Sequence, residues 1–311
     1  MKAKRSFTLV ELMLAMAFLG TMLIGIATIT VRVIGIYQRG LTMRGVSSIG
    51  REIVSDVTRI VSGSNTTNIQ INPTEKEVTP KILKKLRSNY YVVKKDSDGN
   101  QMSGVFCTGS YSYIWNTANS IQEARKYDGK IMSRTDIKPS EAVTLGNKGV
   151  VTIYTTKDKK TIVPRFARIS DPNRYACAHT IDEETGEGIM AKARGANSYK
   201  ITDTRFQLAD HSMDDVHELI NDSEVDLALY HFEVFPATQN TASGQIFYSG
   251  MFILATTRGG VNVKSNGDYC TGSTEDSEYS QYDMDYCTVN KFNFAVRATG
   301  ESGIYRSEVK E

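Results

Sequence analysis

Residues 12 to 31 contain no charged side chain and are mostly apolar. Twenty such residues would form about 30 Å of helix, which matches the hydrocarbon layer of a membrane. The rest of the chain is polar, and the 311 residues together carry 23% charged side chains and a net charge of +2. This balance excludes a strongly basic nucleic-acid-binding protein, and the apolar run argues against an ordinary soluble cytoplasmic enzyme.

Three cations, Lys2, Lys4 and Arg5, precede the apolar run. The positive-inside rule therefore places the N-terminus in the cytosol and the bulk of the chain outside. A secretory signal peptide has a shorter apolar core, of about 7 to 15 residues, and an A-x-A cleavage site that this chain lacks. A plain signal anchor fits the length and the charges. It does not account for Glu11, because a carboxylate at membrane depth costs several kcal/mol unless it is paired.

Residues 4 to 13 read Lys-Arg-Ser-Phe-Thr-Leu-Val-Glu-Leu-Met. This string closely resembles the class III leader junction of type IV pilins and type II secretion pseudopilins. In that family a short basic leader is cut before a Phe, the new amine is N-methylated, and the fifth mature residue is Glu. The resemblance implies a leader over residues 1–6, cleavage between Ser6 and Phe7, methylation of Phe7 and an assembly role for Glu11. The family usually has Gly before the cut, so Ser6 departs from the pattern, although a small residue should fit the same pocket.

The physical chemistry of this resemblance is consistent. Cleavage would create a positive amine on Phe7 beside membrane-embedded helices of neighbouring subunits, and Glu11 could compensate that charge. Loss of the three leader cations would change the net charge from +2 to −1. The implied partners are other pilin subunits, the prepilin peptidase and methylase, the assembly platform protein and the membrane.

A helical pattern continues beyond the apolar run. Apolar residues spaced three and four apart form one face of an amphipathic helix, namely Val46, Ile49, Ile53, Val57 and Ile60. The polar residues 62–65 then stop it, so we predict one helix over residues 7–62, about 84 Å long, with 7–31 in the membrane or filament core. Glycines occur at Gly20, Gly25, Gly35, Gly40, Gly45 and Gly50. Close helix packing is the favoured explanation for the first two, and a segment between 35 and 50 that unwinds on assembly stays open for the others.

Residues 63–311 read as one β-rich head. The expected strand-rich runs are 90–94, 105–115, 150–155, 199–208, 227–235, 245–256 and 291–297, with a hairpin turn at 95–100. Short helices are expected at 79–88, from Thr79-Pro80, and at 212–220, from a capping box. The predicted fold is therefore α+β: a long N-terminal α-helix packed on an antiparallel β-sheet head, as in large pilins and pseudopilins.

All four cysteines lie in this head, which favours disulfides in an exported protein. Pairing Cys270 with Cys287 would close a loop of sixteen intervening residues, worth about 3 kcal/mol. It also resembles the C-terminal disulfide loop of many pilins. Cys107 and Cys177 then pair by elimination, and the alternative is four reduced, buried thiols.

No catalytic motif is found, because the chain lacks G-x-S-x-G, a P-loop and H-E-x-x-H. The four scattered histidines, His179, His211, His217 and His231, fit structural roles, so we predict no enzymatic activity. Acidic residues that could bind calcium between the last two cysteines are Glu275, Asp276, Asp283 and Asp285. Their spacing matches no EF-hand, so a solvated acidic loop without a cofactor is favoured.

A basic cluster suggests DNA as a further partner. Lys81, Lys84, Lys85, Arg87, Lys94 and Lys95 surround Tyr90 and Tyr91. Cations with aromatics could bind DNA during uptake, yet a solvated helix face beside a strand is the favoured interpretation.

The sequence thus predicts a minor pilin, a structural and assembly subunit of a type IV pilus-like filament that serves adhesion, motility or DNA uptake. The subunit would span the cytoplasmic membrane once with its head outside, and would be extracellular after assembly. The alternatives are a type II secretion pseudopilin and a signal-anchored surface-binding domain that does not polymerise.

Overall fold

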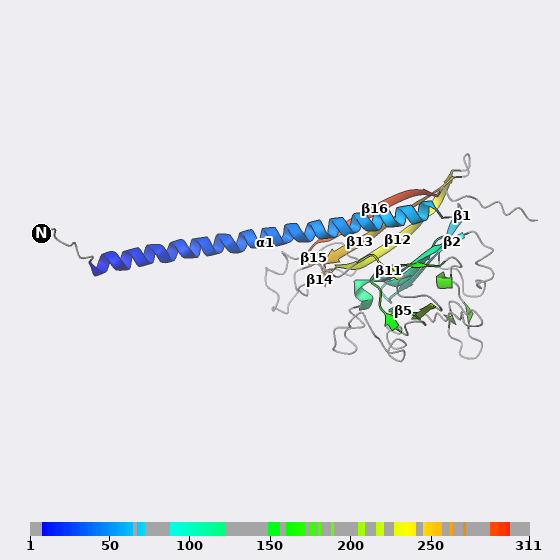
Figure 1. Cartoon of the computed structure of the whole chain (residues 1–311), viewed down its shortest axis with the longest axis horizontal. Coiled ribbons are helices and arrows are strands. Elements are labelled where there is room, and N and C mark those ends of the chain that lie inside the picture. Colours follow the sequence, from blue (N-terminus) through cyan, green and yellow to red (C-terminus); the bar gives the residue numbers. More distant parts are fainter. Residues whose placement is uncertain are drawn as a thin grey trace, which may run out of the picture.

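The computed structural model shows a long helix that projects from a β-rich head (Figure 1). The residues it describes are 8–64, 67–71, 88–121, 149–155, 160–171, 175–177, 180–181, 188–189, 205–208, 216–220, 227–240, 245–256, 262–263, 270–271 and 287–298. The α+β class is therefore as predicted, with one apolar N-terminal helix lying on β-sheet.

The helix α1 spans Leu9–Ser62 without interruption, for 54 residues. Thr8 is its N-cap and Gly63 its C-cap. The helix begins two residues after the predicted start, and residues 1–7 lie outside the described part. The segment between Gly35 and Gly50 is continuous helix, so unwinding there is no feature of this state of the chain.

The head contains short and long strands in several sheets. The six-stranded sheet follows the order β1 (Thr67–Ile71), β2 (Ser88–Lys95), β3 (Gln101–Cys107), β4 (Tyr111–Asn116), β7 (Phe166–Ser170) and β11 (Val216–Glu218). The second consists of β12 (Leu227–Asn240), β13 (Gln245–Thr256) and β16 (Val289–Ala298), and the third of β10 (Arg205–Leu208), β5 (Thr152–Thr155) and β6 (Lys160–Ile162). The remaining elements are η1 (Tyr175–Cys177), β8 (Thr180–Ile181), β9 (Gly188–Ile189), β14 (Asn262–Val263) and β15 (Cys270–Thr271).

Most strand predictions agree with this structure. The run 245–256 is β13, the run 227–235 begins β12, and the turn at 95–100 joins β2 to β3 as an antiparallel hairpin. The run 105–115 proves to be parts of two strands, because β3 and β4 pair antiparallel across a tight turn. Two pairs depart from an all-antiparallel head, since β1 with β2 and β10 with β5 are parallel.

The predicted helix at 212–220 is wrong. Val216–Glu218 instead form β11, which pairs antiparallel with β7. The amide of Leu219 donates to the carbonyl of Phe166 at 2.8 Å, and Leu219 and Ile220 are buried. Pairing with the edge of β7 therefore outweighs the local capping signal at Ser212. Most of the other predicted helix, 79–88, lies outside the described residues, and Ser88 begins β2.

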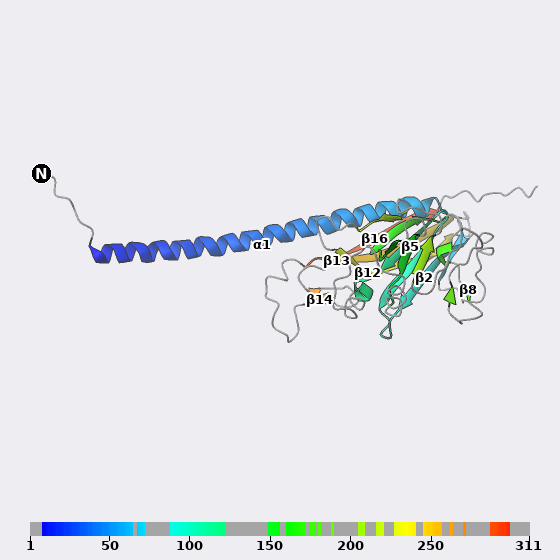
Figure 2. The ribbon, with the colours of Figure 1, turned by 60° about the horizontal axis from the view of Figure 1, so that its bottom comes forward.

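The main core lies between the six-stranded sheet, the three-stranded sheet of β12, β13 and β16, and the second half of α1. Its centre is aromatic. The ring centroid of Phe232 lies 4.8 Å from that of Trp115 and 5.1 Å from that of Phe166. Figure 2 shows α1 running along one side of this sandwich and far beyond it. One face of β16 points into this core: Phe294, Val296 and Ala298 are buried, and the residues between them are exposed, as expected for side chains that alternate across a strand.

At Gly50 a side chain of the head packs directly against the helix backbone. A Cβ atom at this position would lie 2.0 Å from Cζ of Phe292 on β16. Because glycine has no side chain, α1 can approach β16 this closely at Gly50. Gly40, by contrast, has nothing within 4 Å of such an atom.

These two glycines form a matched pair for a stability test. We expect Gly50→Ala to lower the free energy of unfolding by about 1–3 kcal/mol, because it overpacks the contact with Phe292. Gly40→Ala should leave stability unchanged or raise it by up to about 1 kcal/mol through helix propensity. Thermal unfolding of the full-length protein in detergent measures both. Equal melting temperatures for the two variants would contradict the packing role of Gly50.

Candidate functional site

The first turn of α1 is closed by a reciprocal capping box. The Thr8 amide and hydroxyl both donate to Glu11 Oε2 at 3.0 Å, and the Glu11 amide donates to Thr8 Oγ1 at 3.3 Å. This arrangement satisfies orphan amides at the helix start and points the carboxylate toward the N-terminal end of the chain. Glu11 Oε1 has no hydrogen-bond partner among the described residues. The role of Thr8 was missed from the sequence, although Thr-x-x-Glu before an apolar run signals it.

Beyond this cap, the first half of α1 is exposed on every side. From Leu9 to Val31, large apolar side chains are between 49% and 74% exposed. The first buried residue is Val46, so the helix rises about 55 Å from Leu9 before it packs on the head. By length and composition α1 could cross a membrane. A surface of this size needs lipid or protein to cover it.

Polar groups inside this apolar half are satisfied locally. The hydroxyls of Thr21, Thr28 and Thr30 donate to the carbonyls of Phe18, Ile24 and Ile26 at 2.8–2.9 Å. Each threonine thus bonds within its own helix and needs no water. Gly20 and Gly25 have open space around them, so any close packing they permit involves another molecule.

A buried ionic cluster fixes the second half of α1 to the six-stranded sheet. Asp56, which is 9% exposed, accepts a hydrogen bond at Oδ2 from the Tyr113 hydroxyl at 3.0 Å. Its Oδ1 accepts from Arg168 on β7 and, at 2.9 Å, from Arg59 one turn along the helix. The Arg168 guanidinium also lies over the ring of Tyr111, 5.3 Å from its centroid. Burial raises the pKa of Tyr113, and the charge of Asp56 adds to this shift.

Asp56 and Arg59 offer a test of this cluster. We expect Asp56→Ala to lower the free energy of unfolding by about 3–5 kcal/mol, because it leaves Arg168 without its anionic partner in a mostly buried site. Arg59, whose side chain is 70% exposed, should cost less than about 1 kcal/mol when changed to Gln. Chemical denaturation of the full-length protein in detergent compares them. An Asp56→Ala variant as stable as Arg59→Gln would refute the anchoring role.

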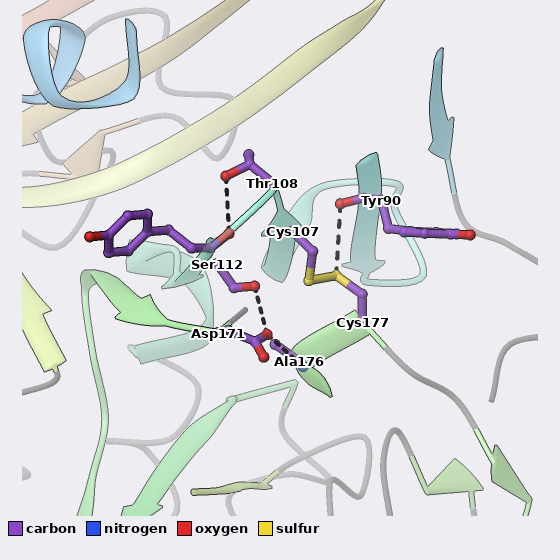
Figure 3. Close-up of a disulfide and its surroundings, with 8 residues drawn as sticks. Tyr90, Cys107, Thr108, Ser112, Asp171, Ala176 and Cys177 are labelled. Atoms are coloured by element: carbon purple, nitrogen blue, oxygen red, sulfur yellow. Dashed lines mark hydrogen bonds between the residues drawn. A yellow bond between two sulfur atoms is a disulfide. The ribbon is translucent and has the colours of Figure 1, made fainter. Parts of the chain in front are cut away.

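The head contains a disulfide between Cys107, the last residue of β3, and Cys177 in η1, with Cα atoms 6.2 Å apart (Figure 3). Beside it, Asp171 Oδ2 accepts from the Ser112 hydroxyl at 2.8 Å and from the Ala176 amide at 3.0 Å. Both cysteines are fully buried. The disulfide and Asp171 together hold the short η1 segment against the six-stranded sheet.

Removing this bridge should be costly. The cysteines are 70 positions apart, and freeing a loop of that length costs about 4 kcal/mol by chain entropy. The double variant Cys107→Ser and Cys177→Ser should therefore melt at a markedly lower temperature than the native protein. A reductant should lower the melting temperature of the native protein toward that of the variant, because only the native protein has this bridge to lose. Unchanged melting in the double variant would contradict this estimate.

The second cysteine pair and the acidic residues predicted from the sequence lie partly or wholly outside the described residues. Cys287 is also disulfide-bonded, but the side chain of Cys270 lies outside the described part, so their pairing stays a prediction. Glu275, Asp276, Asp283 and Asp285 lie outside it as well. Within the residues described, no group of three or more His, Cys, Asp or Glu side chains could hold a metal ion.

The basic cluster and the histidines do not form a site in the described part of the head. Tyr90 and Tyr91 are buried, so they are not available to stack on bases. Tyr91 donates to the carbonyl of Phe232 at 2.5 Å within the core. His217 is exposed on β11, and the ring of His231 lies 3.2 Å from Glu233.

No protein-family profile, curated protein or solved structure matches this chain. The site therefore has to be interpreted from its own geometry. Its parts are an exposed apolar half-helix, a capped carboxylate at the start of that helix, and a second half fixed to the head.

Proposed function

We propose that this protein is a minor pilin, a structural subunit of a type IV pilus-like filament. The observation that carries the proposal is the division of α1 at Val46. One half of a single helix is anchored in the head, and the other is uncovered, apolar from Leu12 to Val31 and capped at its start by Glu11. Such a rod suits a subunit that is stored in a membrane and then packs against identical or related helices.

The start of the helix supports the same proposal. The string from Lys4 to Met13 resembles a prepilin leader junction, with cleavage between Ser6 and Phe7 and methylation of Phe7. A new amine on Phe7 would lie next to Thr8, the N-cap residue. Glu11 Oε2 already serves the cap, and Oε1 can receive the amine of its own chain or of a neighbour. The carboxylate could thus serve both the helix end and the subunit contact.

In this function the subunit is inserted in the cytoplasmic membrane through residues 7–31, with its N-terminus in the cytosol and its head outside. Its partners are the prepilin peptidase and methylase, the platform protein and other pilin subunits. The role is structural, with no catalysis and no cofactor. A type II secretion pseudopilin is the nearest alternative, and gene neighbours would separate the two.

A different class of function is a surface-binding domain that is anchored by an uncleaved helix and never polymerises. N-terminal sequencing of the membrane-extracted protein separates it from a pilin. A chain that begins with methylated Phe7 supports the pilin, and an intact Met1 supports the anchor.

Processing should depend on the size of residue 6. We expect Ser6→Gly to be cleaved as fast as the native chain or faster, because Gly is the family's usual residue. Ser6→Leu should leave precursor in the membrane, since a bulky side chain does not fit a pocket shaped for Gly. Gel mobility and N-terminal sequencing follow the cleavage. Efficient processing of Ser6→Leu would contradict this account.

The role of Glu11 can be separated from its cap. We expect Glu11→Leu to insert and to be cleaved, but to be lost from filaments, because truncating one partner of a buried ion pair costs about 3–5 kcal/mol. Glu11→Gln keeps a side chain that can complete a capping box but removes the charge. It should therefore fail as well.

Thr8→Ala is the matched control for Glu11, because it breaks the cap and leaves the carboxylate. We expect this variant to enter filaments. The measurement is a blot of sheared filaments against membranes. Incorporation of Glu11→Gln at the native level would show that capping, and not charge pairing, explains Glu11.

A further inference from the structure

The stretch of α1 between the apolar run and the head, residues 32–45, is a separate surface. It contains the exposed cations Arg32, Arg39 and Arg44, and the first acidic residue after them is Glu52. None of the three arginines forms an ion pair with the described residues of the chain. This part of the helix is therefore a cationic collar with no counter-charge among the described residues.

Two of these arginines are placed for one common ligand. Arg32 directly follows Val31, the end of the apolar run, so it lies at the level of the lipid headgroups if that run spans the hydrocarbon layer. Arg39 is seven residues further, on the same helix face and about 10 Å higher. Helical side chains point back toward the N-terminus, so both guanidiniums are directed toward the headgroup level, and two long arginine side chains on one face can reach a ligand between them.

Arg44 differs from this pair in both height and direction. It lies about 18 Å beyond Arg32 and is rotated by about 120° around the helix axis, so it faces another side. It is nevertheless the same residue type on the same exposed helix. Arg44 is therefore a matched control for substitutions of Arg32 and Arg39.

We propose that Arg32 and Arg39 bind the phosphate of an anionic phospholipid in the leaflet nearest the head, an inference that rests on the membrane span of the proposed function. A guanidinium binds phosphate oxygens in a bidentate manner, which favours arginine over lysine at such a site. Tyr37, 64% exposed, adds an aromatic ring of the kind enriched at membrane interfaces. Binding would fix the depth of the subunit in the membrane, with Val46, the first buried residue of the helix, about 22 Å beyond Val31.

The test uses the full-length protein reconstituted in phosphatidylcholine vesicles, with trace spin-labelled phosphatidylglycerol or phosphatidylcholine. Electron paramagnetic resonance gives the fraction of each lipid that the protein immobilises. We expect the native protein to prefer phosphatidylglycerol by about fivefold or more. The double variant Arg32→Gln with Arg39→Gln should reduce this preference to near one, while Arg44→Gln should keep it. High salt should weaken the preference for phosphatidylglycerol in the native protein and in Arg44→Gln, and should have little effect on the double variant.

Three results would overturn the proposal. Equal preference in the native protein and the double variant would assign the arginines another partner, such as acidic groups of a neighbouring subunit. An equal loss in Arg44→Gln would show a diffuse charge effect without a site. In both cases a normal immobilised fraction of phosphatidylcholine would leave the membrane span standing. Absence of any immobilised lipid would overturn the span and the lipid site together.

Discussion

Exposed apolar surface on the first half of α1 is the constraint on which the rest of the structure depends. Fourteen large apolar side chains from Leu9 to Val31 are each about half exposed or more. Full burial of an exposed side chain of this kind is worth about 1.5–3 kcal/mol, so covering these partly exposed ones amounts to roughly 10–30 kcal/mol. That is as large as the stability of a typical folded domain or larger. The described part of the head does not supply this burial, because the first buried residue of the helix is Val46, and lipid or other helices have to provide it.

A rod of this kind is useful only if it is firmly joined to the head. The second half of α1 meets this need through two different contacts. Gly50 lets the helix approach Phe292 closely, which gives apolar packing over β16. Asp56 adds a directional contact to β4 and β7 through Tyr113 and Arg168. Packing and ionic contacts on neighbouring turns fix both the distance and the rotation of the helix, and therefore the direction in which its free half projects.

Local patterns in the sequence predicted the helix and the long strands well. Apolar periodicity marked the face of α1 that contains Ile53 and Val57, and these residues are buried as expected. The strand-rich runs 245–256 and 291–297 marked β13 and most of β16. The prediction failed at Val216–Glu218, where pairing with β7 overrides a local capping signal. The Thr8 cap has a local signal, Thr-x-x-Glu before an apolar run, which was not among the sequence predictions.

Other features could not be read from the sequence in principle. Tyr113 and Arg168, the two partners of Asp56 from the sheet, are 57 and 112 positions away in the chain, and only the fold brings them to it. The same holds for Asp171, whose contact with Ser112 supports the disulfide segment. Long-range polar contacts of this kind have no periodic signature, since each depends on one side chain from each of two distant elements.

The division of α1 is the central claim, and water accessibility along the helix tests it most directly. Single cysteines would be placed at successive positions from 9 to 62 in the full-length protein in membranes, and labelled with a water-soluble maleimide. The account predicts no labelling over residues 12–31, labelling on most sides of 36–45, and protection over 46–61 only at Val46, Ile53, Val57 and their neighbours on that face. Uniform labelling of residues 12–31 in membranes, or a lack of periodicity over 46–61, would contradict it.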